Sequence, residues 1–170
     1  MAGHPGATVL WDNVKLLRHS TAICIMAQEM HGGDKMSTQQ NKAILKRFIS
    51  EVNKGNFDVM DELFAEDFVD RYPAHGETPN REGVKRVLAG SRNTFPDFHW
   101  SLEDIIAEGD KVAYRLTMQG TDTGGFTGMP PTGKKVSFTG ISILRFANGK
   151  AVERWYIGDN MTLLHQLGLV

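Results

Sequence analysis

Residues 136–158 read VSFTGISILRFANGKAVERWYIG, and this stretch decides the fold. Asn148-Gly149 is a strong signal for a two-residue β-hairpin, because both residues tolerate the positive φ that such a turn requires. The flanking residues, 136–146 and 151–158, are therefore predicted to form two antiparallel strands. Apolar side chains occur on both faces of the first of these strands, which predicts that it is well buried.

The segments on both sides of the hairpin extend this pattern. Upstream, apolar and polar residues alternate over residues 98–103 and again over residues 112–118, with a turn between them at Glu108-Gly109-Asp110. A long loop rich in glycine and proline follows over residues 120–133. Downstream, the apolar residues between Met161 and Leu169 predict a short closing helix.

Helical periodicity dominates the chain before residue 96. The first helix begins at Ser37 or Thr38, stops at Gly55, and carries one apolar stripe: Ile44, Leu45, Phe48, Ile49 and Val52. A short helix over residues 57–64, a strand over 68–72 and a third helix, capped by Asn80 and ending near Asn93, follow. The pattern predicts an α+β protein, with three N-terminal helices packed on a curved, mixed, mostly antiparallel sheet.

The composition is that of an ordinary globular protein. The chain has 170 residues, 41% of them hydrophobic and 23% charged, and 19 Lys and Arg against 20 Asp and Glu give a net charge of -1. Such a balance gives no reason to expect nucleic acid or an acidic membrane as a partner. No apolar run approaches the roughly 20 residues that span a bilayer. The single cysteine, Cys24, cannot form an intramolecular disulfide, so we expect a reducing, cytoplasmic location.

Residues 1–35 differ from the rest of the chain. Leu10, Val14 and Leu17 allow a short amphipathic helix, and residues 31–35, HGGDK, form a link rich in helix breakers. We expect residues 1–35 to be an appendage and residues 36–170 to be the domain. The alternative is a structured helix that docks on the domain.

One carboxylate stands in an unusual place. Along the strand 151–158, alternation puts Trp155, Ile157 and Asp159 on one face. If this apolar face points inward, burial disfavours the charged carboxylate and raises the pKa of Asp159, as a general acid or base near neutrality requires. Alternatively, Asp159 is the N-cap of the closing helix and accepts a hydrogen bond from the backbone N–H of Thr162, which would lower its pKa.

Other polar residues are weaker candidates for a pocket. Asp70, Tyr72 and His75 lie together before a loop, where a solvated strand end is the simpler interpretation. Arg145 and Arg154 lie on strands, and the simpler interpretation is an acidic partner on a neighbouring strand. These residues therefore allow a site without establishing one.

Several common catalytic motifs are missing from the sequence. The segment GGFTG at residues 124–128 lacks the Lys-Ser/Thr ending and the following helix of a phosphate-binding loop. No Gly-x-Ser-x-Gly motif occurs, and the histidines and acids show no metal-ligand spacing on one helix. We therefore expect no metal and no nucleotide cofactor.

Several motifs together resemble the SnoaL-like polyketide and ester cyclases. They are AEGDKVAYR at residues 107–115, GTDTG at 120–124, GMPPTGKKV at 128–136, GKAVERW at 149–155 and LLHQLG at 163–168. FPD at residues 95–97 also fits, and Asp159 lies between GKAVERW and LLHQLG. The resemblance covers about residues 38–169.

This resemblance implies the nuclear transport factor 2-like fold, in which a bent mixed sheet and helices form a cone around a deep apolar pocket, usually in a dimer. In polyketide cyclases of this family, an aspartate at the Trp-x-x-x-Asp position is the acid/base of an intramolecular aldol ring closure without metal or cofactor. That position is Asp159 here. The chain departs from the family at Arg71, where a histidine is common, and a guanidinium cannot be a general base.

We therefore expect a cofactor-free general acid/base enzyme, similar to a polyketide (aldol-type) cyclase, that acts on a small apolar carbonyl compound. Asp159 would transfer the proton at a carbon next to a carbonyl. Tyr72, His75 or Arg145 would orient the substrate or support an enolate oxygen. The side chains expected in the pocket wall are Phe98, Met118, Phe126, Phe138, Trp155 and Tyr156.

Other interpretations fit the same pattern. One is an epoxide hydrolase or isomerase, in which Asp159 activates a water beside an arginine and acid pair. Another is a non-catalytic domain that binds a small ligand, with Asp159 only as a helix cap. The strands at 112–118 and 136–146 carry more apolar residues than one core needs, so we expect a homodimer formed through the outer face of the sheet.

Overall fold

A computed structural model describes residues 37–170, and these residues have the α+β architecture predicted from the sequence. The expected appendage, residues 1–35, and Cys24 lie outside the described residues. None of the helices described is long and apolar enough to cross a membrane. The elements in chain order are α2 (Thr38–Asn53), α3 (Val59–Leu63), β1 (Phe64–Asp70), α4 (Arg81–Thr94), β2 (His99–Glu108), β3 (Lys111–Thr121), β4 (Lys135–Ala147), β5 (Lys150–Gly158) and α5 (Asn160–Leu167).

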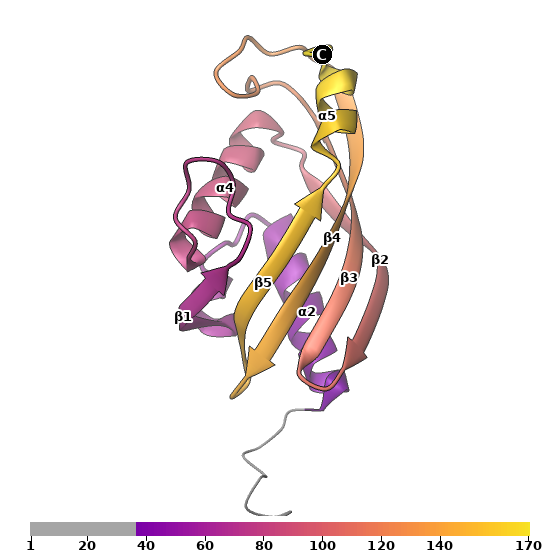
Figure 1. Ribbon diagram of the computed structural model, residues 1–170. Helices are drawn as coiled ribbons and strands as arrows, with labels where there is room; N and C mark the ends of the chain where they lie inside the picture. The colour runs from indigo at the N-terminus through magenta and orange to yellow at the C-terminus, as the bar shows by residue number, and fades with distance from the viewer. Residues whose placement is uncertain (1–36) are drawn as a thin grey trace, which may run out of the picture. The chain divides into compact units, whose positions relative to one another are not determined.

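The strands form one five-stranded sheet in the order β1-β5-β4-β3-β2 (Figure 1). Strands β2 to β5 are antiparallel neighbours, whereas β1 pairs in parallel with β5. The predicted hairpin turn is confirmed, because Asn148 and Gly149 have φ values of 49° and 78°. Strand β1 begins at Phe64, directly after α3, so the predicted strand start at Phe68 is wrong.

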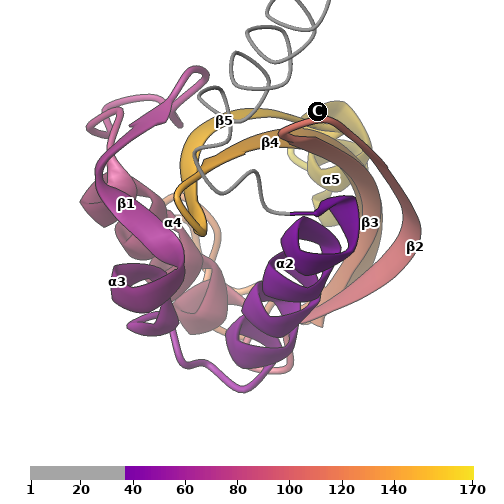
Figure 2. The same ribbon diagram turned by 90° about the horizontal axis from the view of Figure 1, so that it is seen from below.

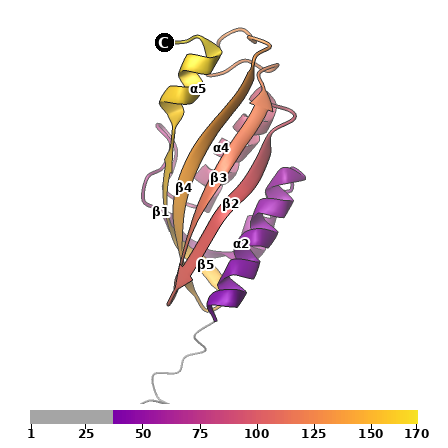
Figure 3. The same cartoon turned by 90° about the vertical axis from the view of Figure 1, so that its right-hand side faces the viewer.

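Helix α2 covers the concave side of the sheet. Figure 2 shows β2 to β5 curving around α2, and Figure 3 shows α2 beside β2. The helix begins with a capping box, in which Ser37 and Gln40 each accept a backbone hydrogen bond from the other. Its buried face includes Leu45, Phe48 and Val52, as the apolar stripe predicts. Burial of each large apolar side chain contributes roughly 1.5–3 kcal/mol, so this contact holds the helix on the sheet.

Strand alternation divides the sheet into two faces, here called the inner face and the outer face. The inner face packs under the helices, and its β3 and β4 residues are all buried: Val112, Tyr114, Leu116, Met118, Gly120, Val136, Phe138, Gly140, Ser142, Leu144 and Phe146. On the outer face of β4, Thr139, Ile141 and Ile143 are exposed. The prediction that this strand is buried on both faces is therefore wrong for the single chain.

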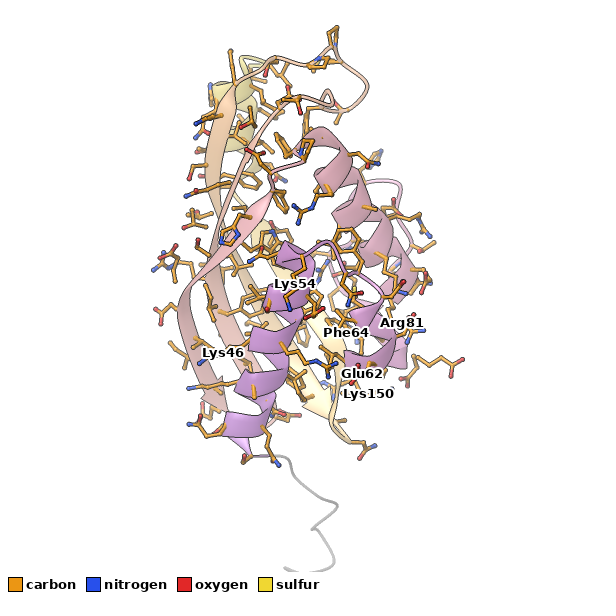
Figure 4. The ribbon with its side chains drawn as sticks, turned by 180° about the vertical axis from the view of Figure 1, so that it is seen from behind. Lys46, Lys54, Glu62, Phe64, Arg81 and Lys150 are labelled. Carbon is orange, nitrogen blue, oxygen red and sulfur yellow. The ribbon has the colours of Figure 1, made fainter. Side chains whose placement is uncertain are left out.

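The helices are also joined to one another by ion pairs. Both terminal nitrogens of Arg47 on α2 donate to the carboxylate of Glu62 on α3, each at 2.6 Å. These hydrogen bonds hold the pKa of Glu62 below its usual range, and Lys150 acts in the same direction. Figure 4 shows Glu62 and Lys150 at the same end of the domain. Because the Arg47–Glu62 pair is exposed, it adds only modest stability.

A buried carboxylate organises the loop between β3 and β4. The side chain of Asp122 accepts hydrogen bonds from the backbone N–H of Gly125 at 3.0 Å and from the N–H and hydroxyl of Thr132 at 2.9 and 2.8 Å. Burial by itself raises the pKa of Asp122, but these hydrogen bonds outweigh burial and lower it. The ionised carboxylate therefore stabilises the folded loop.

We expect Asp122→Asn to lower the melting temperature at pH 7 by roughly 3–12 °C. An amide cannot accept all of these hydrogen bonds, their loss costs about 1.5–3 kcal/mol, and each kcal/mol corresponds to roughly 2–4 °C in a domain of this size. Because the folded pKa is lowered, the contribution is complete above about pH 4 and is lost as the pH falls through the folded value.

Thermal denaturation should therefore show a difference in melting temperature between the wild-type protein and Asp122→Asn that is smaller at pH 3 than at pH 7. The matched control is Asp67→Asn, at an exposed position of β1, which should match the wild-type protein at both values. If the melting temperatures of the wild-type protein and Asp122→Asn differ by the same amount at pH 7 and pH 3, the charge of Asp122 does not stabilise the loop.

Candidate functional site

Asp159 lies at the N-terminus of α5, exposed to solvent. Its carboxylate accepts a hydrogen bond from the backbone N–H of Thr162 at 3.0 Å, and this contact lowers the pKa of Asp159. The predicted inward position and raised pKa are therefore wrong, and the alternative, a helix N-cap, is confirmed. A catalytic role for Asp159 stays a prediction, now without the support of burial.

An irregularity in strand pairing explains the difference. The register between β4 and β5 shifts between Arg145, which pairs with Glu153, and Phe146, which pairs with Ala151. Buried Ala151 lies on the inner face with Phe146, whereas Glu153 lies on the outer face with Arg145. Val152 is the extra residue at this shift, and the alternation is reversed from Glu153 onward. It sends Trp155 and Ile157 outward and turns Arg154 and Tyr156 inward.

The outer face contains an open groove of about 390 Å³. Tyr72, Trp155 and Asp159 all line it, so the structure brings together three of the residues predicted for the site. The remaining lining residues are mainly apolar: Thr139, Gly140, Ile141, Ser142, Ile143, Ile157 and Gly158. The groove is therefore an apolar surface with one carboxylate at its edge.

The two other predicted polar residues do not complete this site. The guanidinium of Arg145 donates to Glu153 at 2.8 Å on the outer face, and Arg71 donates to the same carboxylate. Hydrogen bonds from Arg145 and Arg71 hold the pKa of Glu153 below its usual range. Arg145 thus has the acidic strand partner that was the simpler interpretation. His75 is exposed in the loop between β1 and α4.

The predicted wall residues divide between the two faces of the sheet. Phe98, Met118 and Phe138 are buried in the core, and Phe126 and Tyr156 pack against it while partly exposed. Phe98 stacks on Phe95, with ring centroids 6.2 Å apart. Trp155 is the exception because it lies on the outer face. Five of the six predicted wall residues therefore lie in the hydrophobic core or pack against it, and the sixth, Trp155, lines the groove together with Asp159.

The inner face holds a polar cluster that the sequence predicts only in part, with Tyr156 in the pocket wall and Asp70 and Arg154 as weaker pocket candidates. Asp70 of β1 and Arg154 of β5 are partners in the parallel strand pair. The guanidinium of Arg154 donates to the carboxylate of Asp70 at 2.6 Å, and the two side chains are only 12% and 2% exposed. A buried ion pair of this kind costs desolvation energy. It therefore stabilises the fold no more than apolar residues of similar volume would.

Two tyrosines and a serine complete this inner cluster. Tyr114 is buried beside Ser142, and burial raises the pKa of its phenol. Burial also raises the pKa of Tyr156 to about 12, although the guanidinium of Arg154, 5.5 Å from the ring centroid, opposes the shift. Both phenols are therefore neutral near pH 7 and act as hydrogen-bond donors. Asp70, Tyr114, Ser142, Arg154 and Tyr156 are here called the inner cluster.

The sequence held a signal for this cluster. Asp70 ends an otherwise apolar strand segment, Phe68-Val69-Asp70, and Arg154 alternates with Tyr156 on one face of β5. What the sequence lacks is the pairing of β1 with β5, which joins residues 84 positions apart. Among residues 37–170, no group of three or more His, Cys, Asp or Glu side chains is arranged to hold a metal ion.

Comparisons with known proteins agree with this geometry. Residues 43–167 match the profile of the SnoaL-like polyketide cyclases. A curated relative, nogalonic acid methyl ester cyclase of Streptomyces nogalater, is 29% identical over 125 residues, which cover 71% of this chain and 91% of the relative.

Two solved structures show how the similarity extends to the fold. IdmH from Streptomyces antibioticus, assigned as a polyketide cyclase, has a TM-score of 0.68 and 34% identity, over 75% of this chain and 97% of its own. AclR from Streptomyces galilaeus, assigned as a hydroxylase, has a TM-score of 0.72 and 30% identity, over 79% of this chain and 88% of its own. The predicted nuclear transport factor 2-like fold is thus confirmed.

The outer face also suggests a partner, and we propose that a second copy of this chain covers it. Five of the eight exposed large hydrophobic residues among those described lie on this face: Tyr72, Ile106, Ile141, Ile143 and Ile157. Register aligns Ile106 with Ala113, Ile143 and Trp155 in one row across four strands. An apolar sheet face of this extent is typical of a protein interface.

Analytical ultracentrifugation at micromolar concentration should therefore give twice the mass of the chain. Ile157→Glu, at a position that is 71% exposed, should shift the protein to monomer, because dimerisation would then bury a charge. The control is Met129→Glu, an exposed loop position away from the sheet. A monomeric wild-type protein at high micromolar concentration would rule out the dimer.

Proposed function

The chain belongs to the SnoaL-like polyketide cyclase family, and we propose that it closes a ring in a small polyketide-like carbonyl compound by proton transfer, without a cofactor. The observation that carries this proposal is the inner cluster, a set of polar groups within an apolar inner face. Because Tyr156 and Arg154 are partly exposed, the cluster is not sealed from a substrate.

The chemistry of an aldol ring closure matches these groups. A proton leaves the carbon next to one carbonyl, a carbon–carbon bond forms, and the oxygen of a second carbonyl gains a proton. The developing negative charge on oxygen is stabilised by preorganised hydrogen-bond donors. The phenols of Tyr114 and Tyr156 are neutral donors, and the cation of Arg154 is fixed by Asp70.

Asp159 in the outer groove is the alternative proton-transfer group. It is the position at which the family resemblance places the catalytic aspartate, and Tyr72 lines the same groove. A carboxylate with a lowered pKa is ionised near pH 7 and can still accept a proton. We favour the inner cluster because its groups are withdrawn from bulk water, where hydrogen bonds are stronger.

A second candidate function is hydrolysis of an epoxide. The buried pair of Asp70 and Arg154 supports this candidate, because an arginine and acid pair would hold the attacking water. The phenol of Tyr156 would then protonate the opening epoxide oxygen. A third candidate, ligand binding without turnover, requires only the apolar inner face.

One assay separates these functions. The purified protein is incubated with nogalonic acid methyl ester, on which the curated relative acts, and with styrene oxide. Ring closure gives an isomer of unchanged mass and altered retention in liquid chromatography–mass spectrometry, whereas epoxide hydrolysis adds the mass of water. Binding without either product would support the third function.

We expect Asp159→Asn to keep its rate of ring closure within about threefold of the wild-type rate. Asparagine caps helices about as well as aspartate, so the variant should also fold normally. Asp67→Asn, at an exposed site on β1, controls for the loss of one charge. A fall of about 100-fold or more for Asp159→Asn alone would move the site to the outer groove, because general acid/base catalysis contributes about 10²–10⁴-fold.

A further inference from the structure

We propose that the phenol of Tyr156 is the proton donor to the carbonyl oxygen at which the ring closes, and that Gly140 and Gly158 hold this phenol in position. The inference rests on the proposed cyclase function. It goes further by assigning one atom of the inner cluster to one step, and by identifying the residues that position it.

The two glycines face each other across the β4–β5 pair, directly beside the tyrosine ring. A Cβ atom on Gly140 would lie 2.8 Å from Cε2 of Tyr156, and one on Gly158 would lie 2.5 Å from its phenol oxygen. Real Cβ atoms essentially never come so close to another atom. The ring thus lies against the sheet only because both positions lack a side chain.

The hydroxyl of Tyr156 has only a weak hydrogen-bond partner among the described residues. Its only hydrogen bond among the described residues is to Sδ of Met118 at 3.5 Å, and a thioether sulfur is a weak acceptor. Tyr114, the other phenol of the cluster, is more deeply buried and lies beside Ser142. Tyr156 is therefore the phenol that can give its proton to a bound molecule.

The neighbours of Tyr156 suit a proton donor. Burial keeps the phenol protonated near pH 7, since its pKa is about 12. The guanidinium of Arg154, 5.5 Å from the ring centroid, would stabilise the phenolate that remains after transfer. The site thus favours the neutral phenol at rest and limits the energy of its anion.

The step balances without an oxidant or reductant. The proton on the α-carbon leaves to water, and the carbon's electron pair forms the new bond to the second carbonyl carbon. The oxygen of that carbonyl takes the proton of Tyr156. Water returns a proton to the phenolate, so the product is an isomer of the substrate and the enzyme is regenerated.

With nogalonic acid methyl ester as substrate, Tyr156→Phe should lower kcat by about 100-fold or more, because general acid catalysis contributes at least that much. KM should stay within about threefold and the melting temperature should be unchanged, since only one oxygen is removed. A loss of less than tenfold overturns the proposal.

The positioning role has its own matched pair of variants. Gly158→Ala should lower kcat at least tenfold, because the added methyl would displace the phenol oxygen. Gly90→Ala, on α4, adds a methyl into open space and should match the wild-type protein. Equal activity of Gly158→Ala and the wild-type protein overturns the positioning role.

A fluorinated tyrosine keeps the test independent of folding. Replacing Tyr156 by 3,5-difluorotyrosine makes the phenol more acidic and should move the alkaline limb of the kcat/KM profile to lower pH. A structural role would not move this limb, so an unmoved limb overturns the proposal.

The protein with 3,5-difluorotyrosine at position 156 also distinguishes failure of the role proposed for Tyr156 from failure of the proposed cyclase function. If the wild-type protein converts nothing, the cyclase proposal fails, but the ¹⁹F resonance at position 156 still reports contact with nogalonic acid methyl ester. A shift of that resonance at saturating ligand supports contact at Tyr156. No shift there, or a shift only when the label is at position 72, overturns it.

Discussion

The pairing of β4 with β5 is the constraint on which the rest of the structure depends. The turn at Asn148 and Gly149 starts this pairing, and the register shift near Phe146 then reverses the alternation of β5. A change of one residue in register moves every following side chain to the other face of a sheet. This single irregularity therefore puts Arg154 and Tyr156 under the helices and leaves Trp155 and Ile157 outside.

Local patterns in the sequence were sufficient for the order and type of the elements. The apolar stripe of α2, the cap at Asn80 and the Asn148-Gly149 turn are all local signals, and each is present in the structure. Alternation also placed Asp159 correctly on the same face as Trp155 and Ile157. What it could not supply was which face is inner, because that depends on the irregular pairing with β4 and on the parallel partner β1.

Hydrophobicity was misleading at this strand for a physical reason. Their apolar side chains favour an inward position for Trp155 and Ile157, whereas after Ala151 the inner side chains of the same strand are the cation of Arg154 and the phenol of Tyr156. This inversion is expected where a protein buries polar groups for chemistry and exposes apolar groups for association. The buried pair of Asp70 and Arg154 supports this view, since apolar residues of similar volume would stabilise the fold as well or better.

The departure from the family at Arg71 follows from the same geometry. Asp70 faces inward toward Arg154, so Arg71, the next residue, is directed to the outer face, where it donates to Glu153. The additional cation is thus neutralised on the side of the sheet away from the phenols. The inner cluster keeps one cation and one carboxylate, with no net charge, beside two neutral hydrogen-bond donors. Such a surface suits an uncharged carbonyl compound better than an anion, because an anion would meet the carboxylate of Asp70 as well as the guanidinium.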